Sequence, residues 1–213
     1  MRVATNERPL VHVVDDDASI RSALQDLFDS VGLQAHTYAT AEDFLSADVA
    51  NRPGCIVLDV RLPDMNGLEF QTRLIQIGVG IPVVMMTGFG DISMSVNAMK
   101  RGAVDFLPKP FRDQDMLDAV MAAIERDRQR RAVEDNFSEL LGRFETLSRR
   151  EQQVMLLVTA GKMNKQVAGD LGISEITVKI HRGAAMHKMC ARTYAELVRM
   201  ADALKPHRRK PGN

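Results

Sequence analysis

Residues 10–17 read LVHVVDDD, a mostly apolar run that ends in three consecutive carboxylates. An apolar run of this length is typical of a parallel strand that helices cover on both faces. Aspartate is depleted within strands, so the acids mark the point where the strand ends. In open α/β sheets, the carboxyl edge of the strands is where ligands bind. The stretch therefore predicts both a buried strand and a candidate site at its end.

Four similar runs follow, and helical patterns separate them. The five predicted strands are Leu10–Val14, Ala35–Tyr38, Cys55–Leu58, Ile81–Met86 and Val104–Leu107. The predicted helices are Ser19–Ser30, Ala41–Ala47, Leu68–Ile77, Ile92–Lys100 and Asp115–Ile124. Regular alternation of this kind predicts a doubly wound α/β unit, with a flavodoxin-like sheet of five parallel strands.

The remainder of the chain has only helical patterns. Residues 125–143 are strongly charged and lack proline, which predicts a helical linker extending the last helix of the first unit. A coiled-coil contact between two chains is a weaker alternative there. Beyond it, a capping box at Ser148–Glu151 starts a helix that we expect to reach Ala160. Three more helices are predicted, at Lys165–Leu171, at Glu175–Met189 and at Thr193–Leu204, the last stopped by Pro206. The predicted domains are 10–124, 125–143 and 144–205.

Charge is divided unequally along the chain. Residues 10–124 hold 16 acidic and 8 basic side chains, a net charge of −8, whereas residues 144–205 hold 6 acidic and 10 basic, a net charge of +4. The asymmetry indicates a nucleic-acid partner for the second half. No apolar run is long enough to span a bilayer, and the first residues lack a signal peptide's apolar core. We therefore expect a cytoplasmic protein without a membrane partner. Two cysteines and five scattered histidines predict no transition-metal site.

Several side chains should meet at the carboxyl edge of the predicted sheet. They are Asp15, Asp16, Asp59, Thr87 and Lys109. Converging carboxylates repel one another, and a hard divalent cation such as Mg²⁺ removes that repulsion. Each acid alone could be a helix cap or a solvated loop residue, and for Asp17 that interpretation is as good as a functional one. The joint pattern is far more specific than any member of it.

These motifs resemble the signature of response-regulator receiver domains. The matching residues are Val13-Val14-Asp15-Asp16, Asp59-Val60-Arg61-Leu62-Pro63 with Gly67, Thr87-Gly88 and Lys109-Pro110-Phe111. The resemblance implies that Asp59 accepts a phosphoryl group from a sensor histidine kinase. It implies Mg²⁺ ligands at Asp16, Asp59 and the Arg61 carbonyl, with Asp15 binding through water. It also implies a Thr87–Phe106 switch pair, a phosphoryl contact from Lys109 and a cis Lys109-Pro110 bond.

The second half resembles the LuxR-type helix-turn-helix domain. The motifs are Leu147-Ser148-x-Arg150-Glu151, Asn164-Lys165-Gln166-Val167-Ala168, Leu171-Gly172-Ile173-Ser174 and Thr177-Val178-Lys179-x-His181. Together the two halves are similar to the FixJ subgroup of the NarL family. The resemblance implies that double-stranded DNA contacts Lys165, Thr177, Lys179, His181, Arg182 and Lys188. We expect Lys179 and Arg182 in the groove and Lys165 and Lys188 at phosphates, while His181 could pack instead.

One departure affects the predicted recognition helix. Gly183-Ala184-Ala185 stands where relatives carry longer side chains, and glycine costs roughly 1 kcal/mol in a helix. The departure predicts a shorter reading surface or a different recognised sequence. Met189-Cys190-Ala191 differs too, and we expect that difference to be a variation of the core.

The leading hypothesis is a transcription factor, not an enzyme, that phosphorylation switches. Phosphorylated Asp59 would draw in Thr87, turn Phe106 inward and favour a homodimer through a surface near Val96, Met99 and Lys100. Contact with RNA polymerase and activation of transcription are family-level expectations. A second hypothesis is a DNA binder whose receiver only dimerises; it predicts that Asp59→Asn binds DNA like the wild type. A haloacid-dehalogenase-type phosphatase is disfavoured, because Arg61 stands where its second acid would be. The acidic first half could also mask the basic second half, in which case removing residues 1–124 strengthens DNA binding.

Overall fold

The computed structural model describes residues 8–47, 52–88 and 92–208. The chain divides into two compact units, Met1–Arg131 and Ala132–Asn213. The boundary falls within one helix, Asp113–Glu145, which contributes side chains to the core of each unit.

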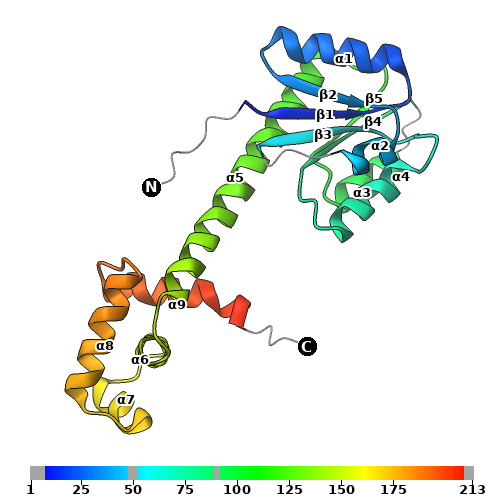
Figure 1. Cartoon of the computed structure of the whole chain (residues 1–213). Helices are drawn as coiled ribbons and strands as arrows, with labels where there is room; N and C mark the ends of the chain where they lie inside the picture. The colour runs from blue at the N-terminus through cyan, green and yellow to red at the C-terminus, as the bar shows by residue number, and fades with distance from the viewer. Residues whose placement is uncertain (1–7, 48–51, 89–91, 209–213) are drawn as a thin grey trace. The chain divides into compact units, whose positions relative to one another are not determined.

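The first unit is built on a parallel sheet (Figure 1). In the described part of the chain this sheet has five strands: β1 (Leu10–Val14), β2 (Gln34–Tyr38), β3 (Gly54–Asp59), β4 (Val83–Thr87) and β5 (Asp105–Pro108). Their order is β2-β1-β3-β4-β5, and every neighbouring pair is parallel. The order confirms the predicted doubly wound topology, which leaves the carboxyl ends of β1, β3, β4 and β5 along one edge.

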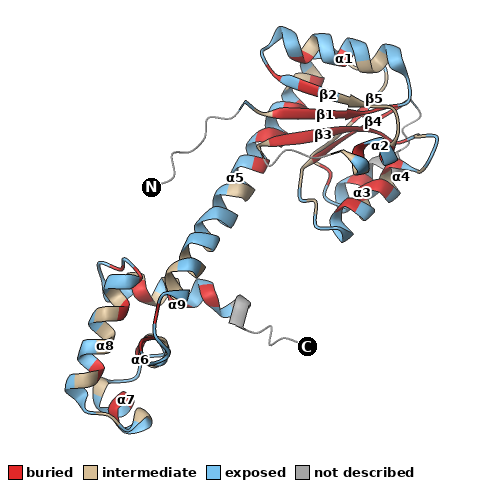
Figure 2. Cartoon of the chain, in the orientation of Figure 1, coloured by how far each residue is buried: buried red, intermediate tan, exposed pale blue. Residues whose placement is uncertain are grey.

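Helices cover both faces of this sheet. They are α1 (Ala18–Ser30), α2 (Ala41–Ser46), α3 (Gly67–Gln76), α4 (Ile92–Lys100) and α5 (Asp113–Glu145). Successive strand residues point to opposite faces of the sheet. On β1, Val11 and Val13 therefore pack in one core with α1 and α5, and Val14 packs in a second core with α2, α3 and α4. Burial on both faces explains why the central strands are almost uniformly apolar (Figure 2).

A buried carboxylate anchors α5 beneath the amino end of β3. Asp127 is fully buried and accepts a hydrogen bond from the Gly54 amide at 3.0 Å. The same carboxylate binds Arg130 Nη2 at 2.7 Å and Arg131 Nε at 2.7 Å. A Cβ at Gly54 would lie 2.1 Å from the Leu10 carbonyl oxygen, so only glycine allows the start of β3 to lie this close to Leu10. The segment predicted as a linker, residues 125–143, is helical as expected. Its first turns pack onto the first unit through the contacts of Asp127.

The second unit is entirely helical among its described residues. It holds the end of α5 with α6 (Arg149–Thr159), α7 (Asn164–Leu171), α8 (Glu175–Lys188) and α9 (Tyr194–Arg208). The predicted capping box at Ser148 and Glu151 is present, and Gly172 ends α7 in the left-handed conformation at φ 64°. The predicted end of the last helix at Pro206 is wrong, because α9 continues to Arg208. A proline removes a single backbone donor, and near its end a helix can lose one bond without stopping.

Two apolar clusters form the core of this unit. The larger packs Leu147, Met155, Met189 and Leu197 together with half-buried side chains from the end of α5, among them Phe137. The smaller joins α6, α7 and α8 through Val154, Val167 and Val178. Met189 and Ala191 are buried, so the expected core variation there is confirmed, and Cys190 between them is exposed with φ 55°.

Candidate functional site

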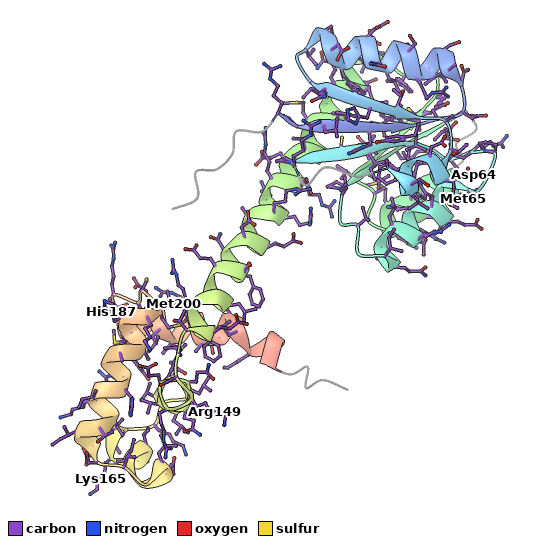
Figure 3. The ribbon with its side chains drawn as sticks, viewed as in Figure 1. Asp64, Met65, Arg149, Lys165, His187 and Met200 are labelled. Atoms are coloured by element: carbon purple, nitrogen blue, oxygen red, sulfur yellow. The ribbon has the colours of Figure 1, made fainter. Side chains whose placement is uncertain are left out.

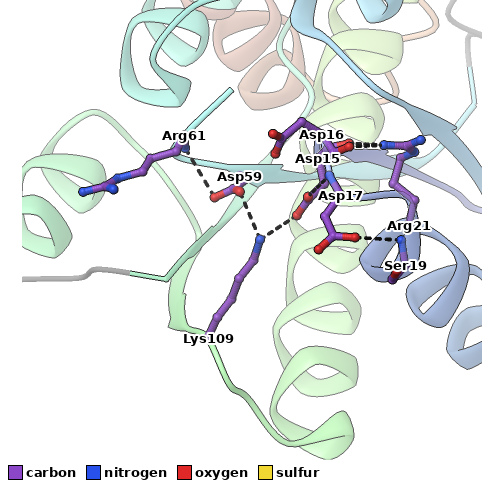
Figure 4. Close-up of polar contacts among 8 residues, drawn as sticks. All are labelled: Asp15, Asp16, Asp17, Ser19, Arg21, Asp59, Arg61 and Lys109. Atoms are coloured by element: carbon purple, nitrogen blue, oxygen red, sulfur yellow. Dashed lines mark hydrogen bonds and ion pairs between the residues drawn. The ribbon is translucent and has the colours of Figure 1, made fainter. Parts of the chain in front are cut away.

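The carboxyl edge of the sheet brings together the acids and the lysine that the strand ends predicted. Lys109 Nζ lies 2.6 Å from Asp15 Oδ2 and 3.0 Å from Asp59 Oδ2 (Figure 4). Asp15 is fully buried and Asp59 is 7% exposed, whereas Asp16 faces solvent. Two buried carboxylates at the ends of β1 and β3 thus share one ammonium from the loop after β5.

Local backbone contacts hold each acid in place. The Asp17 amide donates to Asp15 Oδ1 at 2.9 Å, and Asp17 itself caps α1 by accepting the Ser19 amide at 2.8 Å. The capping role settles the open alternative for Asp17. At the next strand, the Arg61 amide donates to Asp59 Oδ1 at 3.3 Å.

The segment after Asp59 depends on a close approach of backbone to backbone. A Cβ at Gly67 would lie 2.4 Å from the Asp59 carbonyl oxygen, and the Gly67 amide donates to the Val60 carbonyl at 2.8 Å. Asn66 caps the start of α3 by accepting the Leu68 amide. Glycine at position 67 is therefore what lets α3 begin directly beside the end of β3.

The electrostatics of the site follow from its burial. Burial raises the pKa of Asp15 above its usual value, against the hydrogen bonds from Lys109 and the Asp17 amide. Burial acts to lower the pKa of Lys109, but hydrogen bonds to both carboxylates outweigh it and raise that pKa. The ammonium therefore remains protonated and acts as a permanent counter-charge for the buried acids.

The acids also lie close enough together to be candidates for holding a divalent cation. One carboxylate oxygen from each of Asp15, Asp16 and Asp59 lies within 4.8 Å of the others. The site gathers three carboxylates and the Lys109 ammonium, and a divalent cation would offset the repulsion among the carboxylates. An all-oxygen donor set with solvent on the Asp16 side fits Mg²⁺, which keeps part of its water shell in proteins.

The remaining predicted residues lie on β4, on β5 and in the loop that follows β5. Thr87 ends β4 and is fully buried, and its carbonyl accepts the Lys109 amide at 2.7 Å. Phe106 is half-buried and packs against the core on the α3 and α4 face. The Lys109-Pro110 peptide bond is cis, as the resemblance implied.

Arg21 also belongs to this site, although its sequence context does not single it out. Its Nη1 donates to the Asp15 carbonyl at 2.7 Å and to the Asp16 carbonyl at 2.9 Å (Figure 4). The guanidinium, reaching back from α1, thereby fixes the backbone that carries two of the three acids. An arginine on an exposed helix turn is an ordinary surface residue in any sequence pattern, so only the fold reveals this contact.

The residues expected to contact DNA are divided between exposed and internally engaged positions. Lys165 on α7 (Figure 3) and Lys179 on α8 are exposed. Thr177 takes part in the cap of α8, with its Oγ1 2.9 Å from Ser174 Oγ. His181 and Arg182 are half-buried, and the Arg182 guanidinium lies 5.8 Å from the centre of the Tyr194 ring. The two lysines are therefore better placed for a partner than the other three.

Lys188 is exposed but engaged within its own unit. Its Nζ lies 2.7 Å from Glu151 Oε2, and Glu151 in turn accepts the Ser148 amide at 2.7 Å. The ion pair lowers the pKa of Glu151 and connects the end of α8 to the capping box of α6. A phosphate contact by Lys188 would have to compete with this ion pair.

The outward face of α8 carries side chains that sequence reasoning missed. Ile176 is 71% exposed and Ile180 is 64% exposed. His187 is exposed further along the same helix (Figure 3). The signal that could have identified them is the helical spacing of the buried positions Val178 and Ala185, which places these residues on the opposite face.

Comparisons with known proteins agree with both halves of the chain. Residues 11–121 match the family model of the response regulator receiver domain, and residues 145–201 match that of the bacterial regulatory proteins of the luxR family. Among the described residues, no helix combines the length and the apolar character that a membrane crossing requires.

Individual relatives cover nearly the whole chain. Nodulation protein W of Bradyrhizobium diazoefficiens is 53% identical over 92% of this chain and 87% of its own length. The transcriptional regulatory protein FixJ of Azorhizobium caulinodans is 45% identical over 90% of each. The solved structure of the response regulator StyR matches at a TM-score of 0.82 and 45% identity, over 92% of this chain and 99% of StyR. The chain therefore belongs to the NarL/FixJ family of response regulators, in which a receiver domain precedes a LuxR-type DNA-binding domain.

Proposed function

We propose that this response regulator is a transcription factor switched by phosphorylation of Asp59. The observation that carries the proposal is the shared ammonium: Lys109 Nζ lies within 3.0 Å of Asp59 Oδ2 and within 2.6 Å of Asp15 Oδ2. A carboxylate that is nearly buried, faces a fixed cation and lies at the ligand-binding edge of a parallel sheet is arranged to accept an anionic group.

The proposed chemistry is transfer of a phosphoryl group from a phosphohistidine of a sensor histidine kinase. An Asp59 carboxylate oxygen forms a bond to phosphorus while the bond between phosphorus and the histidine nitrogen breaks, leaving its electron pair on that nitrogen. Lys109 turns from the Asp59 oxygen toward the incoming phosphoryl oxygens and compensates their charge. Bound Mg²⁺, held by Asp16, Asp59 and the Arg61 carbonyl with Asp15 through water, would offset charge on the phosphoryl oxygens.

The proposed output couples the site to the second unit. Thr87 would donate to the phosphoryl group, and half-buried Phe106 would then move into the space beside it. We propose that the α4 surface near Val96 and Met99, which are 43% and 47% exposed, then favours a homodimer. A dimer would present two helix-turn-helix domains to paired half-sites in double-stranded DNA and so help RNA polymerase to activate transcription. Because DNA is the proposed partner, we place this action in the cytoplasm, with the receiver over 10–124, the helical linker over 125–143 and the DNA-binding domain over 144–205.

The test is intact mass and oligomeric state after incubation with Mg²⁺ and acetyl phosphate. We expect the wild type to gain one phosphoryl group and shift toward a dimer, and Asp59→Asn to do neither. A matched control is Asp64→Asn, which makes the same chemical change at an exposed carboxylate whose hydrogen bonds are to the backbone amides of Glu42 and Met65. Asp64→Asn should behave like the wild type. Phosphorylation of Asp59→Asn to the wild-type extent would reject Asp59 as the acceptor.

A further inference from the structure

The outward face of α8 combines two large apolar side chains with one lysine, an arrangement that a solvated surface does not require. We propose that Ile176 and Ile180 read thymine methyl groups in the major groove of double-stranded DNA, and that Gly183 lets the helix approach the bases closely. The proposal rests on the proposed DNA binding and adds to it the kind of base that is recognised. It is supported by the exposures of 71% and 64% and by the position of both residues on the second helix of the helix-turn-helix.

The two isoleucines form a continuous strip along α8. They are four residues apart, which places them one above the other on one face of the helix. Val178, lying between them in sequence, is fully buried on the opposite face and fixes the rotation of α8 against α6 and α7. Because the core sets that rotation, both isoleucines must project away from the domain.

Charge identifies the occupant of this face as an anion with apolar features. Lys179 lies beside Ile180 and is exposed, and Lys165 on the neighbouring α7 is exposed as well. The segment 144–205 has 10 basic against 6 acidic residues. A second copy of the chain is a poorer occupant, because two isoleucines cover far less than the roughly 1,200 Å² that a stable protein interface buries. The major groove offers phosphates for the lysines and methyl groups for the isoleucines.

Thymine is the base that offers an apolar contact to an aliphatic side chain in the major groove. In the major groove its C5-methyl group is the apolar feature that distinguishes an A·T pair, whereas the other groups exposed there are hydrogen-bond donors and acceptors. An isoleucine has no polar atom to offer those groups. Two isoleucines one helical turn apart therefore favour two thymines at nearby positions of one half-site.

Gly183 adds a steric condition. It lies one turn beyond Ile180 and is exposed, and a Cβ built there would have nothing within 4 Å. The fold itself therefore does not need glycine at this position. The missing side chain instead removes bulk from the face that enters the groove, so the apolar strip can reach the methyl groups.

The experiment uses the full chain and duplexes that it selects from a randomised pool of double-stranded DNA. The dissociation constant is then measured for the selected duplex and for the same duplex with deoxyuridine in place of thymidine, which removes only the C5-methyl groups. We expect binding to weaken about fourfold for each contacted methyl group lost, the equivalent of one buried carbon. Equal affinity for the two duplexes would overturn the proposal.

Variants assign the effect to individual side chains. Ile176→Ala and Ile180→Ala should each weaken binding to the thymidine duplex. Each should also reduce the difference in affinity between the thymidine duplex and the deoxyuridine duplex. Lys179→Met should weaken both duplexes alike and keep the difference. The matched control is Ile75→Ala on α3, an isoleucine that is 61% exposed and should change neither value. If both Ile176→Ala and Ile180→Ala retained the full difference in affinity between the two duplexes, the proposal would also be overturned.

Failure of the two proposals can be told apart. If no duplex is enriched from the pool and the wild type binds no DNA, with or without phosphorylation, the proposed function fails and the methyl contact fails with it. If DNA is bound but the loss of methyl groups has no effect, only the methyl contact fails. Loss of self-association in Ile176→Ala and Ile180→Ala, with DNA affinity unchanged, would assign the strip to a second copy instead.

Discussion

The two units of this protein treat charge in opposite ways. The receiver buries its key charges and satisfies them internally: Asp15 and Asp59 share Lys109, and Asp127 binds two arginines and the Gly54 amide. The DNA-binding unit leaves Lys165 and Lys179 exposed on its helices. Removing one partner of a buried charge pair is strongly destabilising, whereas an exposed charge is available for a partner and contributes little to the fold.

Glu151 and Lys188 are the exception in the second unit, because they form an ion pair that connects α6 with α8. The contrast is therefore between charges with internal partners and charges that face solvent, wherever they lie. Substitutions that remove one partner of a buried pair should reduce stability strongly. Substitutions of solvent-facing charges should change binding and leave folding intact.

The largest effect is expected at Asp127. Asp127→Ala leaves the Gly54 amide without its acceptor and two arginines without their carboxylate, so the free energy of unfolding of the receiver should fall by about 3–5 kcal/mol. Urea unfolding followed by far-UV circular dichroism measures it. Glu125→Ala is the control, because its ion pair with Arg128 is solvent-exposed and 3.8 Å long. If Asp127→Ala lowered the free energy of unfolding no more than the control does, the proposed difference between buried and exposed charges would be wrong.

A second large effect concerns His12, a buried histidine that stacks on Tyr38 and lies edge-on to Phe44. Burial, with smaller contributions from His36 and Arg52, lowers its pKa from 6.5 to about 4. Between pH 6.5 and about pH 4, His12 is therefore protonated in the unfolded chain and neutral in the folded chain. The stability that neutral His12 contributes is complete above pH 6.5 and is lost as the pH falls toward 4, by up to roughly 3 kcal/mol.

The measurement is the free energy of unfolding of the wild type and of His12→Gln between these two pH values. The variant has no imidazole to protonate at this position, so its stability should fall less steeply with acid. His36→Gln removes an exposed imidazole and should retain most of the wild-type slope. Parallel curves for the wild type and His12→Gln would contradict the prediction.

The smallest effect separates two lysines on the same helix. Lys188→Met removes the ion pair with Glu151 and should lower the stability of the second unit by about 1 kcal/mol, since the pair is partly exposed. Lys179→Met should leave stability within about 0.5 kcal/mol and weaken DNA binding. Thermal unfolding and DNA titration of both variants test the separation. Equal loss of stability in the two would show that internal pairing does not distinguish them.

The receiver site was predictable because parallel strands end at one edge. Asp15, Asp59 and Thr87 each lie at the end of a strand, so their convergence follows from topology alone. The side of α8 that we propose to face DNA was not predictable in the same way. Arg182 lies over Tyr194 and Lys188 binds Glu151, and both partners are distant in sequence. Helical spacing identified a basic helix but could not tell which basic residues the fold had already engaged.

Asp127 illustrates the same limit within the receiver. An acid between Arg126 and Arg130 is the usual pattern of a solvated helix with surface ion pairs, and the charged stretch 125–143 fits that interpretation. The burial of Asp127 depends on the amide of Gly54, which lies 73 positions earlier in the chain. Local pattern carries no information about such a contact.

The long helix α5 has a consequence for how the protein opens locally. Its residues around Val120 and Ile124 are buried in the receiver core, and those around Leu140 pack in the second unit, whereas residues 132–136 are all exposed. Helical turns that lack tertiary packing are only marginally stable in water, so this stretch depends on the packed turns on either side of it. Its backbone bonds should therefore open at a lower free energy than those on either side. Amide hydrogen exchange along this single helix would be slow in the two packed segments and faster in the exposed stretch between them, whereas an isolated helix exchanges most slowly in its middle.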